Sequence, residues 1–237
     1  MTDVSKSPTR IAAMFDAIAG HYDLLNHLLS AGIDTRWRRR AIRSLALTGR
    51  ECVLDLCTGT GDLAIAARVA APPAARVVGI DFAAAMLRVG LEKLRHAAMA
   101  DAIALLRADA SRIPLATGSV DAVTIGFGIR NVQDAAAACA EIHRVLKPAG
   151  RVAILEFAIP TQPVVKAAYL AYFNHVLPRI GRLVSRHNAA YGYLPASVGA
   201  FASPDEFVTI LRHAGFTDIS ASPLTLGIVF LYTASRS

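Results

Sequence analysis

The sequence predicts an α/β fold built on a mainly parallel, seven-stranded sheet with an antiparallel last strand. Short apolar segments and helical segments alternate from residue 51 onward, which is typical of a doubly wound parallel sheet. A glycine-rich turn follows the first apolar segment, as it does where such sheets bind ligands. Two further strand segments follow the end of this alternation, and we expect them to pair in antiparallel fashion.

The expected elements have recognisable ends. Pro72 and Pro73 stop the first helix of the alternating part near Ala70, and the segment from Lys147 to Gly150 stops a later one. The expected strands are Cys52–Cys57, Arg76–Ile80, Ile103–Arg107, Val120–Gly126, Arg151–Phe157, Phe216–Ser220 and Leu226–Thr233. The later expected helices are Ala83–Ala98, Asp134–Leu146 and Pro204–Ala214.

We expect four regions along the chain. Residues 1–50 form an N-terminal arm and helices, with a break near Gly32, and residues 51–159 form a cofactor-binding core. Residues 160–203 interrupt the alternation with a helical insertion rich in Tyr, Phe and Leu, which would cap a substrate. Residues 204–237 supply the last helix and strands, which complete the core.

Composition limits the partners and the compartment. Hydrophobic residues make up 54% of the 237, and the net charge of +7 favours an anionic partner, such as a phospholipid surface, nucleic acid or an acidic substrate. No apolar run reaches the ~18 residues of a membrane span, and the N-terminus lacks the apolar run of a signal peptide. Three cysteines without a CxxC pair fit a reducing compartment. We therefore expect a cytoplasmic protein without a metal site.

The turn after the first expected strand is the candidate cofactor site. Gly59 and Gly61 permit a tight turn and let a ligand approach the backbone. Together with Ala64 they match the G-x-G-x-x-[GA] pattern of dinucleotide sites. Asp81 follows Gly61 by 20 positions (81 − 61), where such sites place a carboxylate on ribose hydroxyls. Both NAD and S-adenosylmethionine contain that ribose, so the spacing alone fits either.

Charge distinguishes the two cofactors. Asp55 and Asp62 flank the turn, and carboxylates would repel the pyrophosphate of NAD. S-adenosylmethionine has no phosphate, and its sulfonium and amino groups are cationic. Asp109 adds an acid after the third expected strand, at the edge where open α/β sheets bind ligands. The acids therefore favour S-adenosylmethionine.

Motifs beyond this turn extend from Met14 to Tyr232. They are Met14-Phe15-Asp16, Tyr22-Asp23-Leu24-Leu25-Asn26, Trp37, Leu54-Asp55 with Gly59-Thr60-Gly61-Asp62, Gly126-Phe127-Gly128-Ile129-Arg130-Asn131, Arg144-Val145-Leu146-Lys147-Pro148, Glu156-Phe157, Leu177-Pro178-Arg179-Ile180-Gly181 and Tyr191-Gly192-Tyr193-Leu194-Pro195. With these motifs the chain resembles the C-methyltransferases of ubiquinone and menaquinone biosynthesis, and demethylmenaquinone methyltransferases in particular. The resemblance implies a Rossmann-like class I S-adenosylmethionine-dependent methyltransferase fold and methylation of a ring carbon of a polyprenylated quinol.

The resemblance also implies which residues contact the cofactor. It places Thr60, Asp81, Asp109 with Ala110, and Gly126 at S-adenosylmethionine. Many relatives have Ser where this chain has Gly126, so a side-chain contact is lost there, whereas a backbone contact is retained.

The implied reaction needs a nucleophilic ring carbon. A carbon beside a phenolic oxygen becomes nucleophilic as that oxygen loses its proton, so the protein must position the ring and stabilise the oxyanion. We expect Arg130 to hold the phenolate, Asn131 to donate a hydrogen bond and His21 to relay a proton. The alternatives are an arginine that pairs with a neighbouring acid and a histidine that stabilises the cap.

Other residues are candidates for binding the substrate. We expect Tyr22 and Asp23 to line the substrate entrance, and Tyr191 and Tyr193 to contact the quinone ring. Packing within the cap is the alternative for each of them. The aromatic residues of the insertion would either pack together or offer apolar surface to a prenyl tail.

Four arginines surround the single tryptophan. Arg36, Arg38, Arg39 and Arg40 with Trp37 would form a membrane-surface patch, because arginine contacts lipid headgroups and Trp favours the interface. A solvated helix face is the alternative. With a polyprenylated substrate, the patch predicts peripheral contact with an anionic membrane at its inner face.

Other functions compete with this interpretation. The positive charge suits an RNA methyltransferase, but no RNA-binding module accompanies it, so we expect no nucleic-acid partner. A small-molecule methyltransferase of the same fold would share the cofactor residues. A lipid-binding protein on the same core would not need the acids around the turn, and those acids disfavour an NAD oxidoreductase. The sequence leaves the oligomeric state open, a homodimer included.

Overall fold

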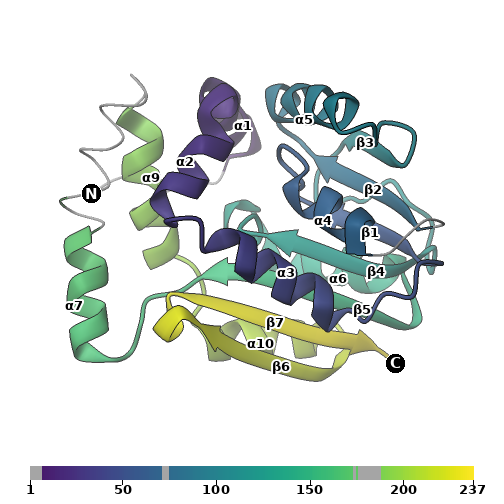
Figure 1. The fold of residues 1–237 in the computed structure, drawn as a ribbon. Helices are drawn as coiled ribbons and strands as arrows, with labels where there is room; N and C mark the ends of the chain where they lie inside the picture. Colours follow the sequence, from purple (N-terminus) through teal and green to yellow (C-terminus); the bar gives the residue numbers. More distant parts are fainter. Residues whose placement is uncertain (1–6, 71–74, 173–174, 176–187) are drawn as a thin grey trace.

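A seven-stranded sheet with helices on both faces forms the centre of the protein (Figure 1). The computed structural model describes residues 7–70, 75–172, 175 and 188–237. The strand order is β3-β2-β1-β4-β5-β7-β6, and β7 runs antiparallel to both of its neighbours. The other paired strands from β1 to β5 are parallel. The predicted mainly parallel sheet with an antiparallel last strand is therefore confirmed.

The strands lie close to the predicted segments, with extensions in the last three. β5 begins at Leu146 because the preceding helix ends at Val145, and Leu146 already pairs with Val120 before the register shifts. The sixth strand continues through Pro223, which an edge strand tolerates because its missing N–H costs no bond inside the sheet. The strands are β1 Cys52–Leu56, β2 Arg76–Asp81, β3 Ile103–Arg107, β4 Val120–Gly126, β5 Leu146–Phe157, β6 Phe216–Leu224 and β7 Val229–Arg236.

The helices of the core begin at clear capping residues. Asp134 accepts a hydrogen bond from the N–H of Ala137 at the start of α6, and Ser203 with Glu206 forms a capping box at the start of α10. The core helices are α4 Asp62–Ala70, α5 Ala84–His96, α6 Ala135–Val145 and α10 Pro204–His213.

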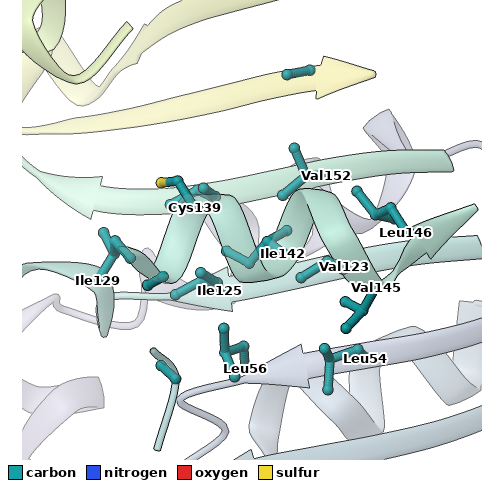
Figure 2. Packing of buried hydrophobic residues seen from close by; sticks show 14 of the residues in the cluster. Leu54, Leu56, Val123, Ile125, Ile129, Cys139, Ile142, Val145, Leu146 and Val152 are labelled. Carbon is teal, nitrogen blue, oxygen red and sulfur yellow. The ribbon is translucent and has the colours of Figure 1, made fainter. Parts of the chain in front are cut away.

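Two apolar layers cover the two faces of the sheet. In β1, Leu54 and Leu56 belong to the layer that packs against α6 and α10. Figure 2 shows them beside Val123 and Ile125 of β4, with Val145 of α6 next to Leu54. Val53, one position earlier, belongs to the other layer, under α4 and an N-terminal helix. This alternation leaves Asp55 on the α4 face, although its neighbours are apolar.

Most of the remaining helices gather beside the edge at which the parallel strands end, whereas α3 (Asp34–Ser44) lies against one face of the sheet (Figure 1). The N-terminal ones are α1 Pro8–Ile18, α2 Tyr22–Leu29 and α3 Asp34–Ser44, and the later ones are α7 Pro163–Ala171 and α9 Asn188–Gly199. Asp16 of α1 accepts a hydrogen bond from the N–H of Ala85 at 2.7 Å, which ties α1 to the start of α5. In the described part of the chain, no helix has both the length and the apolar character needed to cross a membrane. The motif at residues 177–181 lies outside the described residues.

Candidate cofactor and substrate site

The turn after β1 is fixed to the end of β2 by one carboxylate. Oδ2 of Asp81 accepts a hydrogen bond from the N–H of Gly59 at 2.9 Å, and Oδ1 accepts one from the N–H of Ala83 at 2.9 Å. Gly59 has a φ of +56°, a conformation that a side chain would strain. The glycine turn and the acid predicted to contact the cofactor are thus in direct contact.

A cavity opens above this turn, with about 690 Å³ of empty space, open solvent included. Five of the predicted cofactor residues line it together: Gly59, Asp81, Asp109, Ala110 and Gly126. Much of the remaining lining is apolar, including Ile80, Phe82 and Met86. Another lining residue, Gly128, has no room for a side chain, because a Cβ there would overlap the Cβ of Cys57.

The residues present fit S-adenosylmethionine. Asp81 is nearly buried, and a carboxylate can accept more hydrogen bonds than the two it receives from the backbone. Burial raises the pKa of Asp81, while the hydrogen bonds that it accepts from backbone N–H groups oppose the rise. A ligand with hydroxyl donors and positive charge would favour its ionised form.

Three other predicted cofactor residues, Asp55, Thr60 and Gly61, lie outside the lining of this cavity. Asp55 is buried and accepts hydrogen bonds from the hydroxyls of Thr58 at 2.5 Å and Thr124 at 2.7 Å. Burial raises its pKa to about 6 despite these bonds. Asp55 holds the turn through Thr58, and the N–H of Gly61 closes the turn by donating to the carbonyl of Thr58 at 2.9 Å.

Asp62 departs from its predicted environment. We expected its carboxylate to attract the cationic groups of the cofactor, but it pairs with Lys93 and, at 3.0 Å, with Nη1 of Arg38. Both cations come from helices distant in sequence, so the electrostatic argument for this residue was wrong. Its role is to join α4 to α3 and α5.

Thr60 connects the cofactor turn to an N-terminal helix. Its side chain is buried, and its hydroxyl donates to Oδ1 of Asp23 at 2.5 Å. Oδ2 of Asp23 accepts from Nζ of Lys93 at 2.7 Å. Asp23 was predicted at the substrate entrance, but it lies outside the lining of both cavities and holds α2 against the turn.

A second cavity, with about 950 Å³ of empty space, meets the first. Phe15, Tyr22 and Phe127 line both of them. Its lining is mainly apolar and includes Ile18, Leu25, Trp37, Phe157 and Leu194. The rings of Phe127 and Phe157 stack with centroids 4.5 Å apart, and Trp37 contacts both edgewise.

Arg130 lines this second cavity in a fixed orientation. Its Nη1 lies 2.8 Å from Oε1 of Glu156 and also donates to the carbonyl of Phe127, while Nε donates to Oγ of Ser197 at 3.3 Å. Nη2 makes no hydrogen bond to any residue that the structure describes. The predicted alternative, an arginine paired with an acid, is thus present, and one N–H₂ group stays available.

Asn131 and Tyr193 of the predicted set lie close together. The hydroxyl of Tyr193 donates to Oδ1 of Asn131 at 3.1 Å, which joins α9 to the segment after β4. Asn131 lines the first cavity and Tyr193 lines the second. The pair therefore bridges the two cavities.

The other predicted substrate and catalytic residues lie in different places. Tyr22 lines both cavities, and burial raises the pKa of its hydroxyl. His21 is exposed and lines neither cavity, so its predicted proton relay has no support from its position. The side chain of Tyr191 lies outside the described residues.

The predicted membrane patch of Trp37 and its neighbouring arginines does not share one surface. Trp37 is only 7% exposed, and its Nε1 donates to the hydroxyl of Thr225 at 2.9 Å. Its predicted place at a membrane surface is therefore wrong. Arg36, Arg39 and Arg40 of the same helix are exposed.

No role was expected from sequence for Glu156 or for the contacting rings of Trp37, Phe127 and Phe157. An acid inside the apolar run Ile154-Leu155-Glu156 was the available signal, because a completely buried carboxylate requires a partner. Phe15 and Phe157 belong to the motifs of the family resemblance, but nothing in those motifs distinguished a ring that lines a cavity from one that packs in the core.

Comparison with known sequences agrees with this geometry. The family model described as the ubiE/COQ5 methyltransferase family matches residues 1–236. A ubiquinone/menaquinone biosynthesis C-methyltransferase UbiE of Syntrophotalea carbinolica is 50% identical over 94% of this chain and 93% of its own. A demethylmenaquinone methyltransferase of Bacteroides fragilis is 38% identical over 98% of this chain and 94% of its own.

Solved structures support the fold. A SAM-dependent methyltransferase from Methanococcus maripaludis superposes with a TM-score of 0.66 at 20% identity, covering 92% of each chain. Another from Aquifex aeolicus has a TM-score of 0.63 at 17% identity, covering 84% of this chain and 89% of its own. At these identities the likeness shows a shared methyltransferase-type α/β fold.

Proposed function

Because the chain belongs to the ubiE/COQ5 methyltransferase family and is an S-adenosylmethionine-dependent C-methyltransferase of quinone biosynthesis, we propose that it methylates a polyprenylated quinol where its two cavities meet. The observation that carries this proposal is the shared lining of the cavities by Phe15, Tyr22 and Phe127. A methyl donor in one cavity and a ring in the other would lie within reach of each other.

The first cavity would hold the cofactor through the residues at the strand ends. Asp81 would accept hydrogen bonds from ribose hydroxyls, Asp109 with Ala110 would flank the adenine, and the backbone at Gly59 and Gly126 would approach the rest of the molecule. When bound, S-adenosylmethionine supplies an electrophilic methyl group on a positively charged sulfur. The acids nearby favour that positive charge.

The second cavity would hold the quinol. Its apolar lining suits a hydrophobic ring and the first prenyl units, and the stacked rings of Phe127 and Phe157 offer a flat surface beside Arg130. The available Nη2 of Arg130 would donate to the phenolate oxygen, and the amide of Asn131 would donate from the other cavity wall. Both groups would stabilise the oxyanion that activates the ring carbon.

The reaction balances without a redox partner. One C–C bond forms between the ring and the methyl group, and the bond from that methyl group to sulfur breaks, which leaves a neutral thioether. The phenolic proton leaves before the attack and the ring proton leaves after it. The phenolate oxygen then takes up a proton from water, so one proton is released for each methyl group transferred. Arg130 acts as a hydrogen-bond donor and not as the base, because a guanidinium keeps its proton in proteins.

The prenyl tail of the proposed substrate determines where the protein must meet it. We propose that residues 160–203 form the cap predicted from sequence, and that the protein makes peripheral contact with an anionic membrane, where a polyprenylated quinol resides. The net charge of +7 and the exposed arginines of α3 support that contact.

A direct assay tests the proposed substrate class. The purified protein is incubated with S-adenosylmethionine and a chemically reduced naphthoquinol that has a short prenyl tail and no ring methyl. Mass spectrometry should find one added methyl group on a ring carbon, together with S-adenosylhomocysteine. The oxidised quinone should not react, because it lacks the nucleophilic carbon. Methylation of RNA and not of the quinol would contradict the proposal.

A further inference from the structure

A groove separate from both cavities lies between α3 and α4. The two helices pack side by side on one face of the sheet (Figure 1). The groove between them holds about 930 Å³ of empty space, open solvent included. Its floor is apolar, with Ile42, Ile65 and Val69. Arg39 and Arg43 stand on its rim.

The two rim arginines carry uncompensated charge. They lie four residues apart on α3, where like charges repel, and neither forms an ion pair within the part of the chain that the structure describes. The acid of the groove, Asp62, is already paired with Lys93 and Arg38. The groove therefore presents net positive charge above an apolar floor.

This combination of charge and apolar surface indicates the ligand class. Val69 is 64% exposed at the groove, and a free phosphate ion would gain nothing from such surface. An anionic phospholipid matches both parts, because its headgroup phosphate can meet the arginines while its glycerol and first acyl carbons cover the floor.

The groove adjoins the second cavity. Arg38 lines both, and its ion pair with Asp34 at 2.6 Å forms part of the wall between them. On α2, which contributes His27 to the groove, Leu24 and Leu28 are 58% and 48% exposed. Positive charge and exposed apolar side chains therefore occur together beside the cavity proposed to take the quinol.

We propose that the α3–α4 groove binds the headgroup region of one anionic phospholipid and so holds the protein at a bilayer with its second cavity next to the membrane. The binding itself does not depend on the quinol assignment. Only its use, delivery of a lipid-borne quinol, rests on the proposed function.

Vesicle co-sedimentation with matched variants tests the proposal. The double variant Arg39→Gln/Arg43→Gln removes the rim charges, and Arg36→Gln/Arg40→Gln removes the same charge from exposed positions of α3 outside the groove. Binding to phosphatidylglycerol–phosphatidylcholine vesicles should fall about tenfold in the first variant and clearly less in the second. Equal losses would mean that overall charge alone governs binding, and would overturn the proposal that the groove is the binding site.

Two further measurements separate the lipid from other sources of the signal. Val69→Asp should weaken vesicle binding, and unchanged binding would exclude the floor from the site. Glycerol 3-phosphate should fail to displace vesicles at concentrations far above that of the lipid; full displacement would indicate a small-anion site instead.

An activity control distinguishes failure of this proposal from failure of the proposed function. The rate with a water-soluble, short-tailed quinol should be the same in wild type and in Arg39→Gln/Arg43→Gln, while the rate with a long-tailed quinol in anionic vesicles should fall in the variant. Loss with both quinols would overturn the lipid role. Absence of quinol methylation by the wild type would reject the proposed function and leave the vesicle measurement valid.

Discussion

Glu156 fixes both the side chain and the backbone of Arg130. Its Oε1 lies 2.8 Å from Nη1 of Arg130, and its Oε2 accepts from the backbone N–H of the same residue at 3.1 Å. The carboxylate is completely buried. The guanidinium therefore belongs to a neutral pair, and it would act on a phenolate through a directed hydrogen bond more than through net charge.

Replacing Glu156 should change both stability and pH dependence. Glu156→Gln leaves the buried guanidinium without its counter-charge, so the free energy of unfolding should fall by about 3–5 kcal/mol in urea titrations. The unbalanced positive charge should favour the phenolate, so the pH at which kcat is half-maximal should move downward. A purely structural role for Glu156 would lower stability without that shift.

The opposite pH shift is expected for Arg130. Arg130→Met should cut kcat about 10²–10³-fold, the usual loss of one oxyanion-stabilising donor, and leave the affinity for S-adenosylmethionine near that of wild type. The pH optimum should move upward, because a phenol with a pKa near 10 must then ionise unaided. Arg130→Lys should recover only part of the rate, since a point charge replaces a planar group. Full turnover of Arg130→Met at neutral pH would make Arg130 structural.

Asp81 should decide the cofactor affinity. Asp81→Asn keeps the shape but loses the charge, and each lost charged hydrogen bond to ribose should cost about 1.5–3 kcal/mol in calorimetric titrations with S-adenosylmethionine. Asp62→Asn is the matched control, because that acid pairs with Lys93 and Arg38 outside the cavity. Equal affinity in wild type and Asp81→Asn would remove Asp81 from the site. Since Asp81 also accepts two backbone N–H groups, the variant without ligand should lose some stability as well.

Five of the residues predicted to bind the cofactor line one cavity, because strand ends determine where they lie. Asp81, Asp109 and Gly126 follow or end parallel strands, and parallel strands bring their carboxyl ends to one edge of the sheet. Alternating apolar segments predicted those strands, so the edge followed from the fold class.

The predictions that failed for Asp62 and Trp37 concern contacts between residues distant in sequence. The partners of Asp62 come from α3 and α5, and the hydroxyl that accepts from Trp37 comes after β6, so local patterns carried no information about either. His21 is next to a residue that lines both cavities, but a helix turns successive side chains about 100° apart, and its neighbour Tyr22 takes the inward position. Helical segments outside the βα repeat therefore gave weaker predictions than the strands.

Asp55 should give the protein a pH-dependent stability of unusual sign. Its folded-state pKa is about 6 against an ordinary value of 3.8, so between these pH values the folded protein holds a proton that the unfolded chain has released. The free energy of unfolding should therefore decrease as pH rises through this window, by about 3 kcal/mol in total, and stay lowered above it. Asp55→Asn cannot ionise, so its stability relative to wild type should rise by that amount between pH 4 and pH 7.

Glu51 provides the opposite control. Burial raises the pKa of Glu51, but hydrogen bonds from Thr48 and Gly49 outweigh this effect and lower that pKa to about 2. Its stabilisation is present above the ordinary value of 4.5 and is lost toward the folded value of about 2. Glu51→Gln should therefore lose most stability at neutral pH, where Asp55→Asn gains most. Urea titrations of both variants from about pH 2 to about pH 7 would measure the two slopes. A constant difference between Asp55→Asn and wild type above pH 4 would show that Asp55 is ionised there in the folded protein.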